Sequence, residues 1–201
     1  MNAGNIVAKL KEYAALKEVL ACSLHKRCQS QYDCSEPQTT MLYNFDAVKD
    51  KYCAENHLSP LKSADAVTCC GEKIVFVEFK SWKSYLEHGR TLETADIAQK
   101  ATEYATIRKL IDSVIVAKDI TNSTLFDHSE NVVYVIATDI ENNQMNRIVS
   151  NIYNLAAIST KLGTVCRKLL DEKLKENFKD LDYKYKHICC WELDEVLAGI
   201  G

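Results

Sequence analysis

Three charged residues at the open end of a predicted hairpin have the types and spacing of a metal-dependent hydrolytic site. Asp65 precedes one short apolar segment, and Glu78 and Lys80 end the next, within the stretch PLKSADAVTCCGEKIVFVEFKSW over residues 60–82. Carboxylate oxygens are the ligands that magnesium and manganese prefer. A strand this apolar is expected in a core, where an uncompensated carboxylate is costly. The carboxylates therefore need a cation.

The expected geometry of the hairpin brings the two carboxylates together. Side chains alternate between the faces of a strand, so Glu78 and Lys80 share a face. If Gly71 and Glu72 form a two-residue turn, with glycine first as type II′ favours, Asp65 falls directly opposite Glu78. Opposed residues have Cβ atoms about 4.5–5.5 Å apart, where two carboxylates repel each other unless a cation lies between them.

The hairpin therefore predicts a magnesium or manganese site. Asp65 and Glu78 are the expected ligands, the Phe79 carbonyl is a third, and Lys80 orients or activates a water beside the metal. Two alternatives stay open. A longer loop or a bulge shifts the register by one residue and turns one carboxylate to the other face. Alternatively, both carboxylates are exposed at strand ends and Lys80 pairs with one of them, because Glu-x-Lys triplets are common.

The elements that must position this hairpin indicate one α/β domain over residues 1–201. Apolar residues at three- and four-residue steps predict helical segments. These are residues 5–27, a short helix within 41–57, 94–117, 145–178 with a break near Gly163, and 193–197. Compact, β-branched segments predict strands over 62–70, 73–82, 131–139 and 184–191. The polar stretch 28–40 is expected to be a loop. This order favours a mixed central sheet flanked by helices.

Bulk composition limits the class of protein. The 201 residues are 47% hydrophobic and 26% charged, which is ordinary for a globular chain. The formal charge of −3 differs from that of a DNA-coating protein, but a locally basic surface is compatible with it. No apolar run reaches the roughly 18 residues of a membrane span, and the N-terminus lacks the apolar core of a secretory signal. A cytoplasmic protein is expected.

The cysteines give little support for a metal or disulfide framework. Nine cysteines in a chain without a secretory signal favour reduced thiols. Their spacings, six residues between Cys22, Cys28 and Cys34 and adjacent pairs at 69–70 and 189–190, match neither common zinc sites nor iron–sulfur sites. We expect buried or incidental thiols. A cysteine-based activity remains a third and weaker alternative.

In its hairpin residues the chain resembles the PD-(D/E)XK nuclease superfamily. The resemblance covers residues 60–80 and extends loosely over residues 94–139. Asp65 matches the acidic residue of the family, and Glu78 and Lys80 match its (D/E)-x-K. The proline of the family motif is not adjacent to Asp65 here.

The resemblance implies a restriction-endonuclease-like fold, with a core of a helix, a three-stranded antiparallel meander, a helix and a further strand. It implies hydrolysis of phosphodiester bonds by a magnesium- or manganese-dependent nuclease, with DNA as the expected substrate. Many such nucleases pair, so a homodimer or a partner protein is compatible with it. The alternative is a catalytically silent nuclease fold that acts as a binding or assembly module. DNA against RNA, and endo- against exonuclease action, stay open.

Some members of the family add a glutamate from the first helix to the metal site. Glu12 and Glu18 are the candidates, and the spacing does not choose between them. The Gln-x-x-x-Tyr motif of exonuclease-like members is not matched, because Gln99 and Tyr104 are five residues apart.

DNA binding requires basic contacts near the site. The candidates are Lys62, Lys83, Arg90, Lys100, Arg108 and Lys109. The basic residues of 167–175 interleave with acidic ones, which indicates a solvated helix face. Trp82 and Tyr85 could stack on bases, but the packing role of aromatic residues after a core strand is more common.

Overall fold

A mixed six-stranded sheet organises the chain. The computed structural model describes residues 1–20, 41–80, 94–138 and 153–200. The strands lie in the order of the sequence: β1 (Glu18–Leu20), β2 (Met41–Asn44), β3 (Ala66–Cys70), β4 (Lys73–Lys80), β5 (Val132–Thr138) and β6 (Lys184–Cys189). The first four strands pair antiparallel, whereas β4, β5 and β6 are parallel. β4 therefore joins an antiparallel half to a parallel half.

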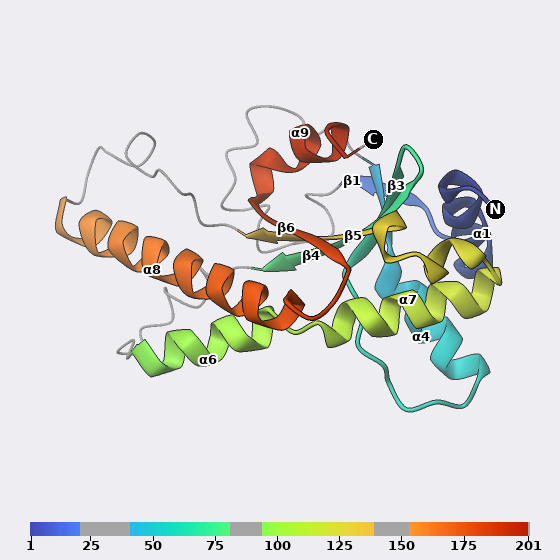
Figure 1. Ribbon diagram of the computed structural model, residues 1–201, viewed down its shortest axis with the longest axis horizontal. Coiled ribbons are helices and arrows are strands. Elements are labelled where there is room, and N and C mark those ends of the chain that lie inside the picture. The colour runs from blue at the N-terminus through green and yellow to red at the C-terminus, as the bar shows by residue number, and fades with distance from the viewer. Residues whose placement is uncertain (21–40, 81–93, 139–152, 201) are drawn as a thin grey trace.

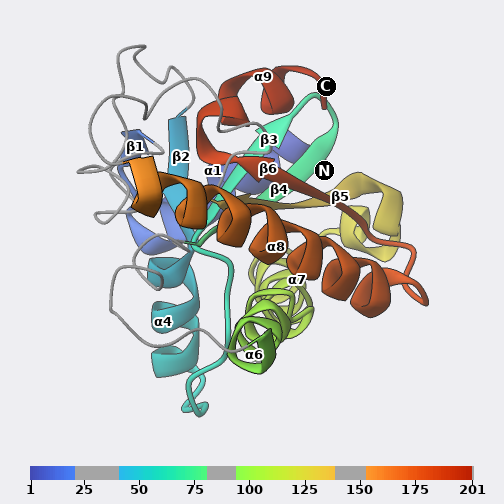
Figure 2. The ribbon, with the colours of Figure 1, turned by 90° about the vertical axis from the view of Figure 1, so that its left-hand side faces the viewer.

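Helices cover both faces of the sheet (Figures 1 and 2). They are α1 (Ala3–Ala14), α4 (Phe45–Glu55), α6 (Thr94–Tyr104), α7 (Arg108–Thr121), α8 (Tyr153–Phe178) and α9 (Leu193–Ala198), with 3-10 turns at Thr124–Asp127, Ser129–Asn131 and Cys190–Glu192. The expected α/β class, with a mixed sheet flanked by helices, is confirmed.

Alternation along β4 divides the core into two layers. Ile74 and Phe76 pack in one buried cluster with side chains of α1, α4, α6, α7 and α8. Val75 and Val77 face the other way and pack with α9. Glu78 continues the Ile74–Phe76 series, since strand side chains alternate. The carboxylate thus points into the larger layer, between the sheet and several helices.

Several predicted elements are confirmed within a few residues. They are the hairpin, the short helix within residues 41–57, the strand of residues 131–139, and the final strand and helix. α8 is helical throughout, so the predicted break near Gly163 is wrong. The sequence does not predict β2, because four residues are too few to show a period. β2 pairs with β3, so β2, β3 and β4 are three consecutive strands of the four-stranded antiparallel half of the sheet.

The predicted helix over residues 5–27 is wrong beyond α1. Ala15 adopts a left-handed backbone with φ 51°, and the N–H of Leu16 bonds to the carbonyl of Lys11 at 2.9 Å. This arrangement ends a helix by satisfying its last carbonyls. The chain then enters β1, and the rest of the predicted helix lies outside the described residues. The loop expected over residues 28–40 lies outside them too.

The single helix predicted over residues 94–117 is two helices. The carbonyl of Ala105, at the break, accepts a hydrogen bond of 2.8 Å from the side-chain amide of Asn177 in α8. This partner, far away in sequence, takes the carbonyl that a continuous helix would bond to Lys109. α7 consequently starts afresh, with Lys109 in its first turn.

In the described part of the chain, the helices are too short or too polar to cross a membrane.

Candidate functional site

The hairpin has the predicted register. Cys70 pairs with Lys73, and the ladder runs to Ala66 opposite Val77. The next pair along the ladder places Asp65 opposite Glu78. Gly71 has a φ of 57°, the conformation that favours glycine in the turn. The register shift that the sequence leaves open does not occur.

Asp65 is held against β4 by its own side chain. Its Oδ2 atom accepts a hydrogen bond of 2.7 Å from the backbone N–H of Phe79. Its carbonyl accepts from the N–H of Phe45, the first residue of α4, at 3.1 Å. The carboxylate is half-buried and has one oxygen committed to the fold. The role of the Phe79 carbonyl as a metal ligand stays a prediction.

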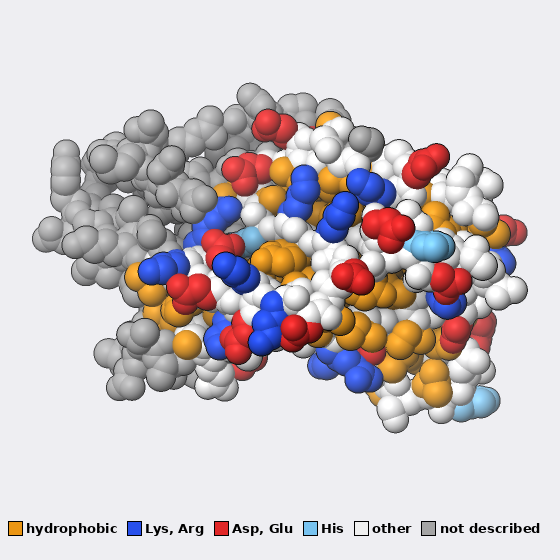
Figure 3. Space-filling model, in the orientation of Figure 1, with side chains coloured by type: hydrophobic (Ala, Val, Ile, Leu, Met, Phe, Trp, Pro, Cys, Tyr) orange, Lys and Arg blue, Asp and Glu red, His pale blue; other side chains and the backbone are white. Residues whose placement is uncertain are grey.

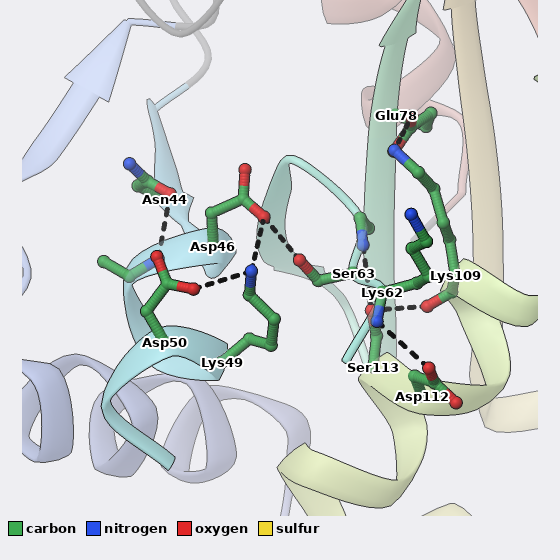
Figure 4. Close-up of polar contacts among 12 residues, drawn as sticks. Asn44, Asp46, Lys49, Asp50, Lys62, Ser63, Glu78, Lys109, Asp112 and Ser113 are labelled. Carbon is green, nitrogen blue, oxygen red and sulfur yellow. Dashed lines mark hydrogen bonds and ion pairs between the residues drawn. The ribbon is translucent and has the colours of Figure 1, made fainter. Parts of the chain in front are cut away.

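Glu78 is fully buried, and its carboxylate contacts charged side chains (Figure 4). Its Oε1 atom contacts two ammonium groups, those of Lys80 and Lys109. Its Oε2 atom has no hydrogen-bond partner in the described part of the structure. Burial raises the pKa of Glu78, and the charge of Asp65 raises it further, against the opposite effect of the two lysines. An exposed strand-end position, the second alternative, is therefore wrong for Glu78.

Lys80 stays a cation at neutral pH. Burial by itself lowers its pKa, but the adjacent carboxylates of Glu78 and Asp65 outweigh that effect and the pKa is raised. Its side chain is 19% exposed. Lys80 is thus a partly buried positive charge beside Glu78, as its position two residues along the same strand predicts.

Lys109 is the site residue that sequence reasoning misses. The sequence predicts Lys109 only as one of several basic residues near the site. In the structure its ammonium group contacts Glu78 from α7. A signal exists in the sequence. Basic residues are unfavourable in the first turn of a helix, and α7 begins with Arg108 and Lys109, with no acidic residue in that turn.

The first turns of α7 also hold the segment that leads into Asp65 (Figure 4). The Ser113 hydroxyl accepts from the N–H of Ala64 at 2.9 Å and donates to the carbonyl of Lys109 at 2.7 Å. The Asp112 carboxylate accepts from the N–H of Lys62 at 3.1 Å. One helix therefore fixes the backbone before Asp65 and carries a cation to Glu78.

α4 holds the same segment from its other side. The Ser63 hydroxyl donates to the carboxylate of Asp46, in the first turn of α4. Lys49 bridges Asp46 and Asp50 at 3.7 and 2.6 Å. Figure 4 shows this network beside the contacts of α7. The approach to Asp65 is thus fixed by side chains of two helices rather than by the hairpin alone.

The other predicted site residues lie elsewhere. Glu12 is exposed on α1, whose buried face is formed by other residues. Glu18 begins β1, the edge strand, from which β2 and β3 separate β4. Gln99, which the unmatched motif did not assign to the site, is exposed and bonds to Glu103. The helix that carries Glu12 and the strand that begins with Glu18 therefore do not place either glutamate beside Glu78.

Three of the four basic candidates that the structure describes contact carboxylates: Lys100, Arg108 and Lys109. Lys100 pairs with Glu103, and Arg108 with Asp112. Over the described part of the face in Figure 3, Lys and Arg side chains lie among Asp and Glu side chains rather than in a continuous basic band. In α8, Lys173 pairs with Glu176, as a solvated face predicts, but Arg167 is buried against β6, so the prediction is wrong for Arg167. Lys83, Arg90, Trp82 and Tyr85 lie outside the described residues.

A polar cluster on β5 and β6 adjoins the site. Thr138 pairs in register with Lys80 at the ends of their strands. Its hydroxyl lies 3.1 Å from Nε2 of His187, whose Nδ1 lies 2.6 Å from the Asp171 carboxylate. This cluster joins α8 to the sheet, and the sequence does not predict it because its members lie far apart in the chain.

The six cysteines that the structure describes are buried or half-buried and form no disulfide with one another. Burial raises the pKa of Cys69 and Cys70 and so disfavours their thiolates. Cys189 accepts a hydrogen bond from the Arg167 guanidinium at 2.9 Å, in the buried contact between β6 and α8. The predicted buried thiols agree with the described cysteines, of which Cys53, Cys166, Cys189 and Cys190 are buried.

The pair of Asp65 and Glu78 suits a magnesium-like cation. In the described residues, His, Cys, Asp and Glu side chains do not gather in groups of three or more. Mg²⁺ needs no such group, because it keeps several waters and is often bound through one or two carboxylates. The unpartnered Oε2 atom of Glu78 supports the fit, since a buried carboxylate oxygen needs a cation or a donor.

Comparison of the chain with protein-family models, with curated proteins and with solved structures found no match.

Proposed function

We propose that this chain is a divalent-metal-dependent nuclease with a restriction-endonuclease-like fold, and that DNA is its substrate. The buried Glu78 carboxylate carries the proposal. It lies in register with Asp65, next to Lys80, and has one oxygen without a described hydrogen-bond partner. A buried carboxylate contributes less to stability than a well-packed apolar side chain, so stability alone does not explain a glutamate at this position. A metal site explains why the strand ends in this way.

The order of the elements supports the fold part of the proposal. α1 precedes the antiparallel meander of β2, β3 and β4, and α6 and α7 then lead to β5, which is parallel to β4. This order agrees with the core that the PD-(D/E)XK resemblance implies. Two elements are additions to that order. β1 stands between α1 and the meander and pairs with β2, and α4 stands between the first two strands of the meander. α8, β6 and α9 follow the core.

Each residue has a defined part in the proposed chemistry. Asp65, Glu78 and the Phe79 carbonyl would hold the cation. A bound divalent cation polarises the phosphate and lowers the pKa of its water. Lys80, with its raised pKa, orients the attacking water as a hydrogen-bond donor rather than removing its proton.

The test is cleavage of nucleic acid by the purified protein. Supercoiled DNA, linear DNA and RNA are incubated with Mg²⁺, Mn²⁺ or EDTA, and Glu78→Gln and Lys80→Ala are assayed beside the wild type. We expect metal-dependent cutting that both substitutions abolish. Equal cutting by the wild type and Glu78→Gln would contradict the proposal, and the preferred substrate is identified in the same assay.

One observation favours a second candidate, a catalytically silent nuclease fold that binds a partner. Lys80 and Lys109 already supply two positive charges to the buried Glu78 and the half-buried Asp65. A cluster neutralised by its own lysines can be stable without a metal. This candidate predicts no cutting with any metal and unchanged partner binding in Glu78→Gln, whereas robust turnover in Mg²⁺ would exclude it.

A further inference from the structure

Lys109 occupies a place that local helix energetics disfavour. The N-terminus of a helix carries a partial positive charge, so a lysine there costs roughly what an acidic residue gains. α7 begins with two basic residues, lacks an acidic residue in its first turn, and has no side-chain cap at Ile107. The contact of Lys109 with Glu78 gives one reason for this choice. Because Lys109 lies in the first turn of α7, the positive end of that helix is close to the same residue, and this points to a second reason.

The two lysines on Glu78 are not equivalent. Lys80 lies on the same strand as Glu78, and β4 is an inner strand of the sheet. The strand therefore fixes the side chain of Lys80 on the same face as that of Glu78. Lys109 reaches Glu78 from a different element, at the end of a helix. A cation that binds to Glu78 is repelled by both ammonium groups, because both lie beside the same carboxylate.

We propose that Lys109 holds Glu78 before the metal binds and then contacts the scissile phosphate of the nucleic acid. The inference rests on the proposed nuclease function and adds to it a substrate-binding residue that the (D/E)-x-K motif does not contain. Anions bind favourably at helix N-termini, so a phosphate near the start of α7 meets both the helix end and the ammonium group. Lys109 therefore competes with the metal and binds the substrate.

The charges of the site agree with this role. Asp65 and Glu78 are balanced by Lys80 and Lys109 when all four are ionised. A divalent cation gives the cluster two positive charges. A phosphodiester attacked by hydroxide carries two negative charges. The net charge of the metal-bound site balances these two charges only when Lys109 is present. Preorganised charge of this kind lowers the barrier of the reaction.

The experiment measures Mn²⁺ binding separately from cutting. Free Mn²⁺ is followed by electron paramagnetic resonance during titration of the wild type, Lys109→Met, Lys109→Arg and Lys118→Met. Lys118 is a matched control because it lies on the same helix and pairs with the exposed Asp127. Lys109→Arg keeps the charge and tests for rescue, and thermal melting shows that each variant folds.

We expect Lys109→Met to bind Mn²⁺ about fivefold or more tightly than the wild type, because one competing cation is lost. At saturating Mn²⁺, its kcat for DNA cleavage falls by about tenfold or more. Lys118→Met stays near the wild type in both measurements, and Lys109→Arg, which keeps the charge, falls between Lys109→Met and the wild type. Unchanged Mn²⁺ affinity or unchanged kcat in Lys109→Met overturns this inference and leaves the nuclease proposal standing. Failure of both wild type and Lys109→Met to bind Mn²⁺ overturns both.

Discussion

Two substitutions of Asp65 separate its structural contribution from its chemical one. Asp65→Asn keeps an oxygen that can accept from the N–H of Phe79, whereas Asp65→Ala removes it. Both substitutions remove a negative charge that strengthens the binding of a divalent cation. We therefore expect both variants to lose Mn²⁺ binding and cutting, but only the alanine variant to lose appreciable stability.

The size of the stability loss follows from the hydrogen bond. Asp65 Oδ2 accepts from the Phe79 N–H at 2.7 Å, and Phe79 is buried. A buried donor left without a partner costs about 1–3 kcal/mol. For a chain of this length each kcal/mol lowers the melting temperature by about 2–4 °C, so Asp65→Ala should melt about 2–12 °C below the wild type.

Asp65→Asn should remain close to the wild type in stability. The hydrogen bond from the Phe79 N–H to the neutral asparagine is weaker than the charge-assisted bond to Asp65. Loss of the negative charge offsets this, because the charge of Asp65 opposes ionisation of the buried Glu78. We expect a net change within about 1 kcal/mol.

Differential scanning calorimetry of the three proteins at pH 7 measures these differences, and Mn²⁺ titration measures the loss of the metal site. Equal melting temperatures for the asparagine and alanine variants would refute the assigned hydrogen bond. Tight Mn²⁺ binding by Asp65→Asn would refute the assignment of Asp65 as a ligand.

Three further predictions concern buried or coupled groups. Ser113→Ala should lower the free energy of unfolding by about 1–3 kcal/mol in urea titrations, because the N–H of Ala64 loses its partner. Tyr134→Phe should leave that free energy unchanged or raise it by up to about 1 kcal/mol, because the buried hydroxyl has no hydrogen-bond partner in the described structure. Burial and the neighbouring Glu55 raise the pKa of Tyr13 to about 12. Unfolded tyrosine loses its proton near pH 10, so stability should fall as pH rises from about 10 to 12, and less so in Tyr13→Phe.

Each of these predictions has an outcome that contradicts it. The control for Ser113→Ala is Ser59→Ala, in an exposed position. Equal stability of the two variants would show that Ser113 of α7 does not stabilise the segment before Asp65. A loss above about 2 kcal/mol in Tyr134→Phe would mean that its hydroxyl has a stabilising partner. Parallel pH curves for the wild type and Tyr13→Phe would show that Tyr13 does not titrate as stated.

The hairpin was predictable because its determinants are local. The two apolar runs, the glycine of the turn and the two-residue loop length fix the register, and the register alone places Asp65 opposite Glu78. The β4 strand shows the limit of the same reasoning. Its period gives the face of Glu78 but not the partner that approaches that face.

Contacts between distant segments explain what the sequence does not predict. The break before α7 depends on Asn177, which takes the carbonyl of Ala105 across the fold. That break starts a new helix whose first turn carries Lys109 to Glu78. The first helix ends early because Ala15 adopts a left-handed conformation that its residue type does not favour. Helical periodicity alone cannot locate either boundary.

The most direct test of the metal site is a crystal of the wild-type protein soaked in Mn²⁺ and examined by anomalous scattering. We predict an anomalous peak bonded to the carboxylates of both Asp65 and Glu78, with the Lys109 ammonium group moved away from Glu78. A crystal in which Glu78 keeps both lysines, with no Mn²⁺ peak beside it at saturating metal, would contradict the central claim that this carboxylate pair is a metal site.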